Sequence, residues 1–267
     1  MDGASSNGHL KIVEWLHNNR NEGCSGNAMW YAAKNGHLNV LKWLHANRTE
    51  GMRANGNSID WAASNGHIDV VEYLNSMGNQ ICTKRAMNWA AANGHLKVVK
   101  WLHYNRNEGC TREALDRAAE NGHLEVVQFL SVNRKEGGSV RAMNQAALNG
   151  HLKVLQWLHS NRKEGASSNA MDNAASNGHL ETVKWLQSKG YNCTTNAMDW
   201  AAARGHLDVV QWLAENRKEG CTRAALDWSN HGKHCKVIDY ICSNPKISKK
   251  CLRNFDAHSS DACCIII

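Results

Sequence analysis

The sequence predicts an all-α helical solenoid built from about nine two-helix repeats. One short motif, Asn-Gly-His or a close variant, recurs along almost the whole chain of 267 residues. Each copy is preceded by a segment with an amphipathic helical period and followed by a second, more apolar segment. The composition is also skewed, with eleven Trp but only two Phe and one Pro. Such a skew is expected when one template is copied many times.

The histidine of this motif sets the register of the repeats. Successive histidines are separated by 28, 30, 28, 28, 28, 28, 27 and 28 residues. They are His9, His37, His67, His95, His123, His151, His179, His206 and His234. The spacing predicts one array over residues 1–243, with units at about 1–23, 24–51, 52–81, 82–109, 110–137, 138–165, 166–192, 193–220 and 221–243. Pro245 is expected to end the array, and residues 244–267 are expected to form a basic, flexible tail.

The first helix of each unit is expected to begin at a Ser or Thr and to end at the Asn-Gly pair. A side-chain oxygen at the start accepts a hydrogen bond from a backbone N–H of the first turn. Thr83, Thr111, Thr194 and Thr222 hold this place. The glycine readily adopts the left-handed conformation that closes a helix. A pair of small alanines in the middle of the helix allows a neighbouring helix to approach closely.

The second helix is expected to start at the histidine and to end near the sequence Asn-Arg-x-Glu-Gly. Its apolar positions in one unit are Leu38, Val40, Leu41, Trp43 and Leu44. This stripe is too wide for a helix that buries a single face. It suits a helix that is flanked by a similar helix on each side, as stacked repeats require.

Over residues 1–243 these features resemble the ankyrin repeat. The segment Met171–His179 is similar to the helix-one signature of that family, and Leu180, Val183, Trp185 and Leu186 match its second helix. The resemblance is strongest to short, Trp-rich arrays common in oomycetes, amoebae and giant viruses. It implies an all-α ankyrin-type solenoid that binds another protein through the concave face formed by the first helices.

The sequence departs from the family pattern in its period and in one histidine. The period is about 28 residues, whereas ankyrin repeats have 33. We therefore expect short loops in place of most of the β-hairpin fingers, so that a partner depends more on helix one. The helix-one histidine of the family is replaced here by Asp or Asn. These residues are Asp60, Asn88, Asp116, Asn144, Asp172, Asp199 and Asp227.

The first unit begins part-way through the pattern. Met1–Ala4 aligns with Met171–Ala174, so the first turn of helix one is missing. Two explanations stay open, namely that the first unit frays or that the chain is a piece of a longer array. We favour the second.

The histidines and cysteines are explained by the repeat rather than by catalysis. Beyond the nine motif histidines, His17, His45, His103 and His159 share the end of helix two, where a positive charge is favoured. Cys24, Cys82, Cys110, Cys193 and Cys221 share the loop before helix one. Adjacent stacked helices lie about 8–10 Å apart, which is too far for a disulfide between cysteines of neighbouring units. A zinc site is not expected either, because zinc needs four converging ligands. We therefore expect these cysteines to be small, half-buried residues.

An enzymatic function is not predicted. No nucleotide-binding, metalloprotease or serine-hydrolase motif is present, and nearly every polar residue has an equivalent in another unit, whereas an active site needs one unique constellation. We therefore expect no catalytic residue, no cofactor and no metal. Ten cysteines without a signal peptide favour a reducing compartment, and hence a cytoplasmic or nuclear protein.

The partner-binding residues are expected where the units differ from one another. One variable helix-one position carries Tyr31, Trp61, Trp89, Arg117, Gln145, Asn173, Trp200 and Trp228. Aromatic and Arg side chains are favoured at the centres of interfaces. Whether these tryptophans are exposed or only fill space between units stays open. Basic residues near the start of helix one, Arg53, Lys84, Arg85, Arg112 and Arg141, add a predicted strip for an acidic protein segment.

Arg and Glu recur together in the loops after helix two, for example at Arg106 and Glu108. A solvated, charge-balanced edge is the first interpretation, and an electrostatic docking rim is the second. The third and seventh units lack the pair.

The predicted function is a monomeric protein–protein interaction scaffold. The alternative is a nucleic-acid-binding helical repeat, which the net charge of +7 and the stackable Trp suggest. Against it, Glu accompanies most loop Arg residues. A third hypothesis is a membrane-tethered adaptor, because the last four residues fit a prenylation signal on Cys264, with Cys263 as a palmitoylation candidate.

Overall fold

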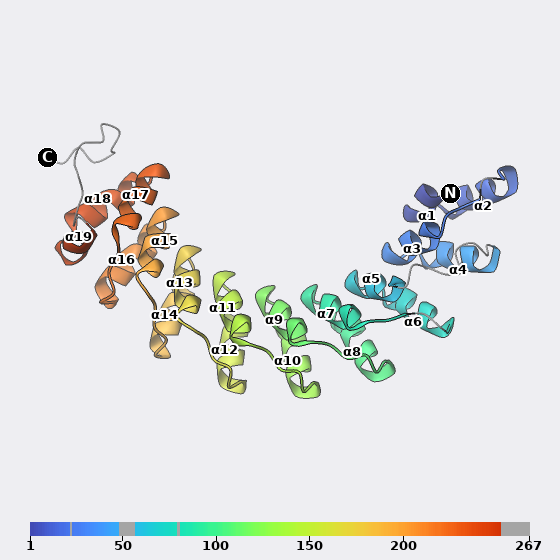
Figure 1. Ribbon diagram of the computed structural model, residues 1–267, viewed down its shortest axis with the longest axis horizontal. Helices are drawn as coiled ribbons and strands as arrows, with labels where there is room; N and C mark the ends of the chain where they lie inside the picture. The colour runs from blue at the N-terminus through green and yellow to red at the C-terminus, as the bar shows by residue number, and fades with distance from the viewer. Residues whose placement is uncertain (22, 48–56, 79–80, 252–267) are drawn as a thin grey trace. The chain divides into compact units, whose positions relative to one another are not determined.

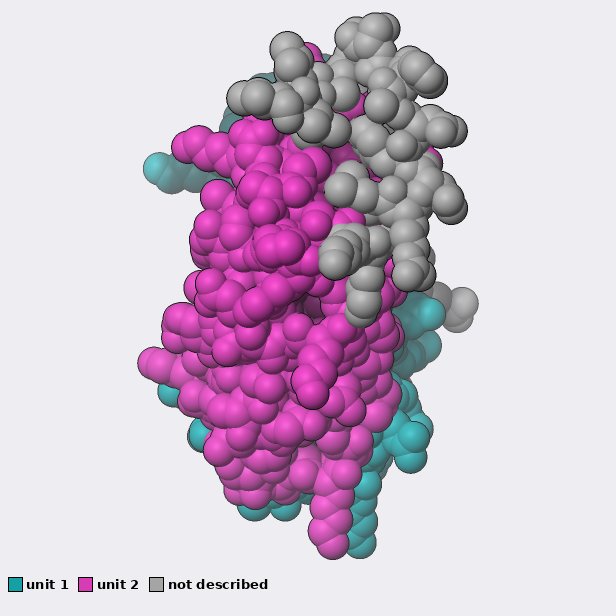
Figure 2. Space-filling view, turned by 90° about the vertical axis from the view of Figure 1, so that its left-hand side faces the viewer, with its two compact units in different colours: residues 1–138 teal, residues 139–267 magenta. Residues whose placement is uncertain are grey.

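A computed structural model of the chain describes residues 1–21, 23–47, 57–78 and 81–251. These residues form nineteen helices and no strand, which confirms the predicted all-α solenoid of two-helix repeats. No helix among them is both long enough and apolar enough to cross a bilayer. The chain divides into two compact units, residues 1–138 and 139–267, which Figure 2 colours separately.

The first compact unit, unit 1, contains five pairs of helices (Figure 1). They are α1 (Asp2–Ser6), α2 (Leu10–Asn19), α3 (Asn27–Lys34), α4 (Leu38–Asn47), α5 (Ser58–Ser64), α6 (Ile68–Ser76), α7 (Lys84–Ala92), α8 (Leu96–Asn105), α9 (Arg112–Glu120) and α10 (Leu124–Asn133). Each odd-numbered helix packs against the next odd-numbered one, and each even-numbered helix packs against the next even-numbered one. The odd helices are therefore the first helices of the repeats, and the even helices are the second.

The second compact unit, unit 2, continues the same pattern with nine helices. They are α11 (Val140–Leu148), α12 (Leu152–Asn161), α13 (Asn169–Ser176), α14 (Leu180–Ser188), α15 (Asn196–Ala203), α16 (Leu207–Asn216), α17 (Arg223–His231), α18 (Cys235–Ser243) and α19 (Pro245–Cys251). The helices α11, α13, α15 and α17 form one row of neighbours within this unit.

The beginning of the expected tail is a packed helix. Helix α19 starts at Pro245 and contacts both α17 and α18. Its residues Ile247 and Cys251 are buried and lie four positions apart, so they share one helical face. Pro245 stands at the first position of this helix, where a missing N–H costs nothing. Residues 252–267, including Cys263 and Cys264, lie outside the described residues.

The predicted helix starts are confirmed where hydroxyl groups meet the backbone. The Thr83 hydroxyl accepts a hydrogen bond from the N–H of Arg85, and the Thr222 hydroxyl accepts one from the N–H of Ala224. Thr194 stands one residue before the cap of α15, yet its hydroxyl still accepts a hydrogen bond from the first helical N–H. These bonds satisfy donors that a helix end otherwise leaves unpaired.

The Asn-Gly-His motif joins each repeat to the one before it. The Asn93 side chain donates a hydrogen bond of 2.7 Å to the carbonyl of Ser64, the last residue of α5, and His95 bonds the same carbonyl. The ring of His95 also lies against Gly66, where an added Cβ would come within 2.6 Å of Nδ1. The motif therefore needs glycine both for its positive φ of 79° and for the room that the histidine takes.

We expect Gly150→Ala to destabilise unit 2 more than Gly165→Ala. Both glycines have a positive φ, so both substitutions are strained, by about 1 kcal/mol. Only at Gly150 would the new Cβ also meet a histidine ring, at 2.7 Å from Nδ1 of His179. No described atom lies within 4 Å of the Cβ position at Gly165. Urea unfolding followed by circular dichroism measures the difference, and equal midpoints for the two variants would contradict this account.

Acidification is expected to lower the stability of the folded array. Burial is the largest influence on His67, His95, His123 and His206, and it lowers the pKa of each below the ordinary 6.5. The unfolded chain therefore binds more protons than the folded chain as the pH falls below about 6.5, so stability is lost through that window and is retained above it. Thermal unfolding at pH 7.5 and 5.5 tests this. A His95→Gln, His123→Gln variant should show a smaller difference between the two pH values.

Candidate functional site

A partly buried polar link fixes the start of several first helices relative to the preceding one. The Asp60 carboxylate accepts hydrogen bonds from the N–H and the hydroxyl of Thr83, at 2.9 and 2.6 Å. Burial raises the pKa of Asp60, while these hydrogen bonds oppose the rise. Asn88 makes two bonds at the same place, because its oxygen accepts from the N–H of Thr111 and its amide donates to the Thr111 hydroxyl. The Asp or Asn that replaces the family histidine is thus part of the scaffold.

The same link recurs in unit 2 and at the start of the chain. Asp172 binds Thr194 and Asp199 binds Thr222, each through two hydrogen bonds of 2.7–2.8 Å. Asp2 binds Ser25 in the same way, so the shortened helix α1 is still joined to the next repeat.

We expect Asp60→Ala to lower the free energy of unfolding by about 1–2 kcal/mol, because the N–H and hydroxyl of Thr83 lose their acceptor. Asp60→Asn should cost clearly less, since Asn88 already performs this role in the next repeat. Urea unfolding of the two variants beside the parent chain measures both effects. Equal losses for Ala and Asn would show that the side-chain oxygen is not what matters.

The predicted variable residues all lie on the first helices, next to these links. Tyr31, Trp61, Trp89 and Arg117 belong to unit 1, and Gln145, Asn173, Trp200 and Trp228 belong to unit 2. None is buried, and Trp228 is 47% exposed. The sequence left open whether these tryptophans are exposed or fill space between repeats. In unit 1 both are true, because Trp61 and Trp89 are partly exposed and also contact each other.

Unit 1 carries a continuous aromatic row across α3, α5 and α7. The row consists of Trp30, Tyr31, Trp61 and Trp89. The ring centroids of Trp30 and Trp61 are 6.0 Å apart, and those of Trp61 and Trp89 are 5.0 Å apart. Trp30 also contacts Tyr31, at 4.6 Å. A partner would therefore meet a single surface of indole and phenol rings rather than isolated side chains.

Two cations lie on the aromatic row. The Lys34 ammonium is 5.2 Å from the Trp30 ring centroid and 4.8 Å from that of Trp61, so it sits between two nearly perpendicular rings. The Arg85 guanidinium lies 5.7 Å from the Trp89 ring. Such contacts hold the positive charges in place at the surface.

Sequence reasoning missed Trp30 as a binding candidate. It stands where most other units have the linking Asp or Asn, as Asp60 and Asn88 show. Unit 1 therefore gives up one polar link at α3 and gains an aromatic contact. The signal that could have found it is this single departure at an otherwise constant position.

The predicted basic residues are exposed, and several have partners within the chain. Lys84, Arg85 and Arg112 are exposed at the starts of α7 and α9. The Arg112 Nε donates a hydrogen bond to the Glu136 carbonyl. Arg141 is exposed at the start of α11 in unit 2. Arg53 lies outside the described residues. The predicted strip therefore consists here of Lys84, Arg85 and Arg112 in unit 1 and, separately, of Arg141 in unit 2.

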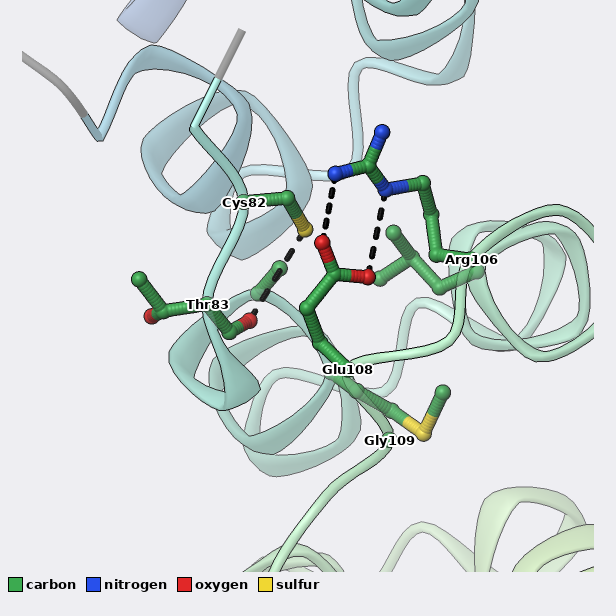
Figure 3. Close-up of a pocket in the computed structure, with 8 residues that line it drawn as sticks. Cys82, Thr83, Arg106, Glu108 and Gly109 are labelled. Carbon is green, nitrogen blue, oxygen red and sulfur yellow. Dashed lines mark hydrogen bonds and ion pairs between the residues drawn. The ribbon is translucent and has the colours of Figure 1, made fainter.

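The Arg and Glu of the loops form compact ion pairs that keep the edge charge-balanced, and their side chains are only partly exposed to solvent. Arg106 and Glu108 face each other through two hydrogen bonds (Figure 3), and Arg106 also donates one to the Asn75 side chain. The side chain of Arg217 is only 11% exposed. These loops fold back onto the preceding repeat, and this arrangement shields the pairs partly from solvent. A docking rim made of the same groups stays untested.

The buried cysteines of these loops are poorly suited to nucleophilic chemistry. Burial raises the pKa of Cys82 to about 12, and the pKa of Cys110 and Cys193 to about 11. The thiolate is the reactive form of cysteine, so these thiols are unreactive at neutral pH. No cluster of three or more metal-binding side chains occurs among the described residues.

Cys221 differs from the expectation of a small residue without a bonded partner. It is buried and forms a disulfide with Cys251, and the two Cα atoms are 5.9 Å apart. That separation is within the range for disulfides. The sequence argument compared cysteines of adjacent repeats only, and the partner comes instead from α19, which lies outside the repeat pattern.

The comparisons with known proteins agree with the repeat. The family model described as ankyrin repeats (3 copies) matches residues 1–85, 143–224 and 171–251. A second, described as ankyrin repeats (many copies), matches residues 87–131 and 115–159. No curated protein matches the sequence. A crystal structure of the human ASB11 ankyrin repeat domain is similar in fold, with a TM-score of 0.52 and 19% identity, over 65% of this chain and 91% of that one.

Proposed function

Because the chain belongs to the ankyrin-repeat family, we propose that it binds another protein through its first helices, with a preference for an acidic segment. Ankyrin repeats are generally protein–protein interaction modules, and the family is typically without enzymatic activity. The binding residues proposed for unit 1 are the aromatic row together with Lys34, Lys84, Arg85 and Arg112.

The aromatic row is the observation that carries this proposal. Large rings with part of their surface exposed offer apolar area that a partner can remove from water. Because the rings already contact one another, they lose little freedom when a partner covers them. Interfaces commonly draw most of their binding energy from a few Trp, Tyr and Arg residues.

The acidic preference follows from the cations beside the rings. Lys34 and Arg85 are held against indole rings, and Lys84 and Arg112 are exposed nearby on α7 and α9. A carboxylate that approaches the row would meet positive charge without a large reorganisation of these side chains. Such complementarity mainly increases the rate of association and the selectivity for an acidic partner.

We expect the quadruple variant Lys84→Ala, Arg85→Ala, Arg112→Ala, Arg141→Ala to bind a random copolymer of Glu and Tyr at least about tenfold more weakly than the parent chain, a loss of about 1.4 kcal/mol. The physical reason is the loss of four exposed positive charges that attract the carboxylates. Fluorescence anisotropy with the labelled copolymer measures the dissociation constant.

The matched control is Lys11→Ala, Lys97→Ala, Lys135→Ala, Lys153→Ala, which removes the same charge from exposed positions outside the first helices. This control should bind as the parent does. Unchanged binding by the first variant, or an equal loss in the control, would contradict the proposed surface. Tighter binding of single-stranded RNA than of the copolymer, with a steep dependence on salt, would favour the nucleic-acid alternative.

A further inference from the structure

The loop cysteines are covered by the repeat that follows them. Cys82 lies beside the Arg106–Glu108 pair, with its sulfur facing the Glu108 carboxylate (Figure 3). The Cys110 N–H donates a hydrogen bond to Glu136 in the next loop. In unit 2, Arg217 lies against Cys193 in the same way. One function of each Arg–Glu pair is thus to close the preceding loop.

The last of these cysteines is covered differently. After α18, the chain has Pro245 where the preceding repeat has Arg217, and Ile247 where it has Glu219. Helix α19 packs there instead, and Cys251 forms the disulfide with Cys221. A covalent bond therefore stands at Cys221 where an ion pair stands beside Cys82, Cys110 and Cys193.

We propose that the Cys221–Cys251 disulfide is a reversible latch that holds α19 against α17 and α18, and that it exchanges with glutathione-type thiols. Helix α19 has only seven residues, which is too short to be stable as an isolated helix. Its buried apolar side chains are those of Ile247 and Cys251. Its position therefore depends on a few contacts and on the covalent bond.

The buried sulfur atoms become accessible when α19 moves. Both cysteines are at most 3% exposed, so a thiol reaches the bond only after local opening of α19. Short elements with few buried contacts are among the first parts of a protein to open. The latch is thus protected while α19 is docked and is open to exchange during brief undocking.

Reduction of the Cys221–Cys251 disulfide by glutathione takes place in two thiol–disulfide exchange steps. A glutathione thiolate attacks one sulfur of the bond, which forms a mixed disulfide and releases one cysteine thiolate. A second glutathione thiolate attacks the mixed disulfide and releases the other cysteine. The products are two protein thiols and one glutathione disulfide, so two electrons and two protons pass from glutathione to the protein. In the reducing compartment that the sequence predicts, the latch rests open and closes on oxidation.

Hydrogen exchange on the full chain tests the latch. In a buffer rich in glutathione disulfide, amides of α19 should be protected, and in excess reduced glutathione they should exchange at least about tenfold faster. Amides of α13 and α15 should be unchanged. Differential alkylation followed by peptide mapping should report the bond in the first buffer and two thiols in the second.

Three variants separate the latch from a general effect of the buffer. Cys251→Ser, and Cys221→Ser as a second test in case either variant folds poorly, should give fast α19 exchange in both buffers. Cys242→Ser, on the neighbouring helix α18, should respond to the buffers as the parent does. The proposal is overturned if Cys221 and Cys251 are both alkylated in the oxidising buffer. It is also overturned if the bond survives excess reduced glutathione, or if α19 exchange is the same in both states.

Discussion

The structure depends on a single backbone carbonyl in each repeat, the one at the end of the first helix. A helix leaves its last carbonyl groups without partners, and a stacked helix cannot leave them to water alone. Here the next repeat supplies the donors. The Asn65 amide reaches the Lys34 carbonyl at 2.8 Å, and the Asn121 amide reaches that of Ala92 at 2.7 Å. The following histidine binds the same oxygen, so the most frequent motif in the sequence is the joint between repeats.

Around this joint, hydrogen bonds and close packing act on different parts of the helix. The Asp–Thr pairs fix the beginning of several first helices, and the Asn and His side chains fix the end of the helix before them. Between them, alanines such as Ala90 and Ala91 are fully buried and permit close helix contact. The positions that take part in none of these interactions are the ones that vary between repeats. The exposed surface of the first helices is thus available for binding without loss of the scaffold.

Structural features that recur in every repeat could be predicted from the sequence, whereas features that occur only once could not. The period, the two helices of a repeat and the glycine turns each have many copies, so their physical causes could be inferred from the pattern. Trp30 and helix α19 have no copies, and their contacts depend on packing rather than on period. The partial burial of the Arg–Glu pairs was also missed, because the sequence does not tell toward which repeat a loop folds. The unit boundaries and the binding residues remain predictions.

The joint between repeats also sets how far apart contacting residues are along the chain. Asn93 and Ser64 are 29 positions apart, and Thr83 and Asp60 are 23 apart. Every such contact is made with the immediate neighbour, so no part of either compact unit has to await the folding of a distant segment. Nucleation can begin at any adjacent pair of repeats and spread in both directions. For the same reason, duplication or loss of one repeat leaves two surfaces that still match, which is a simple physical route by which an array of this kind changes its length.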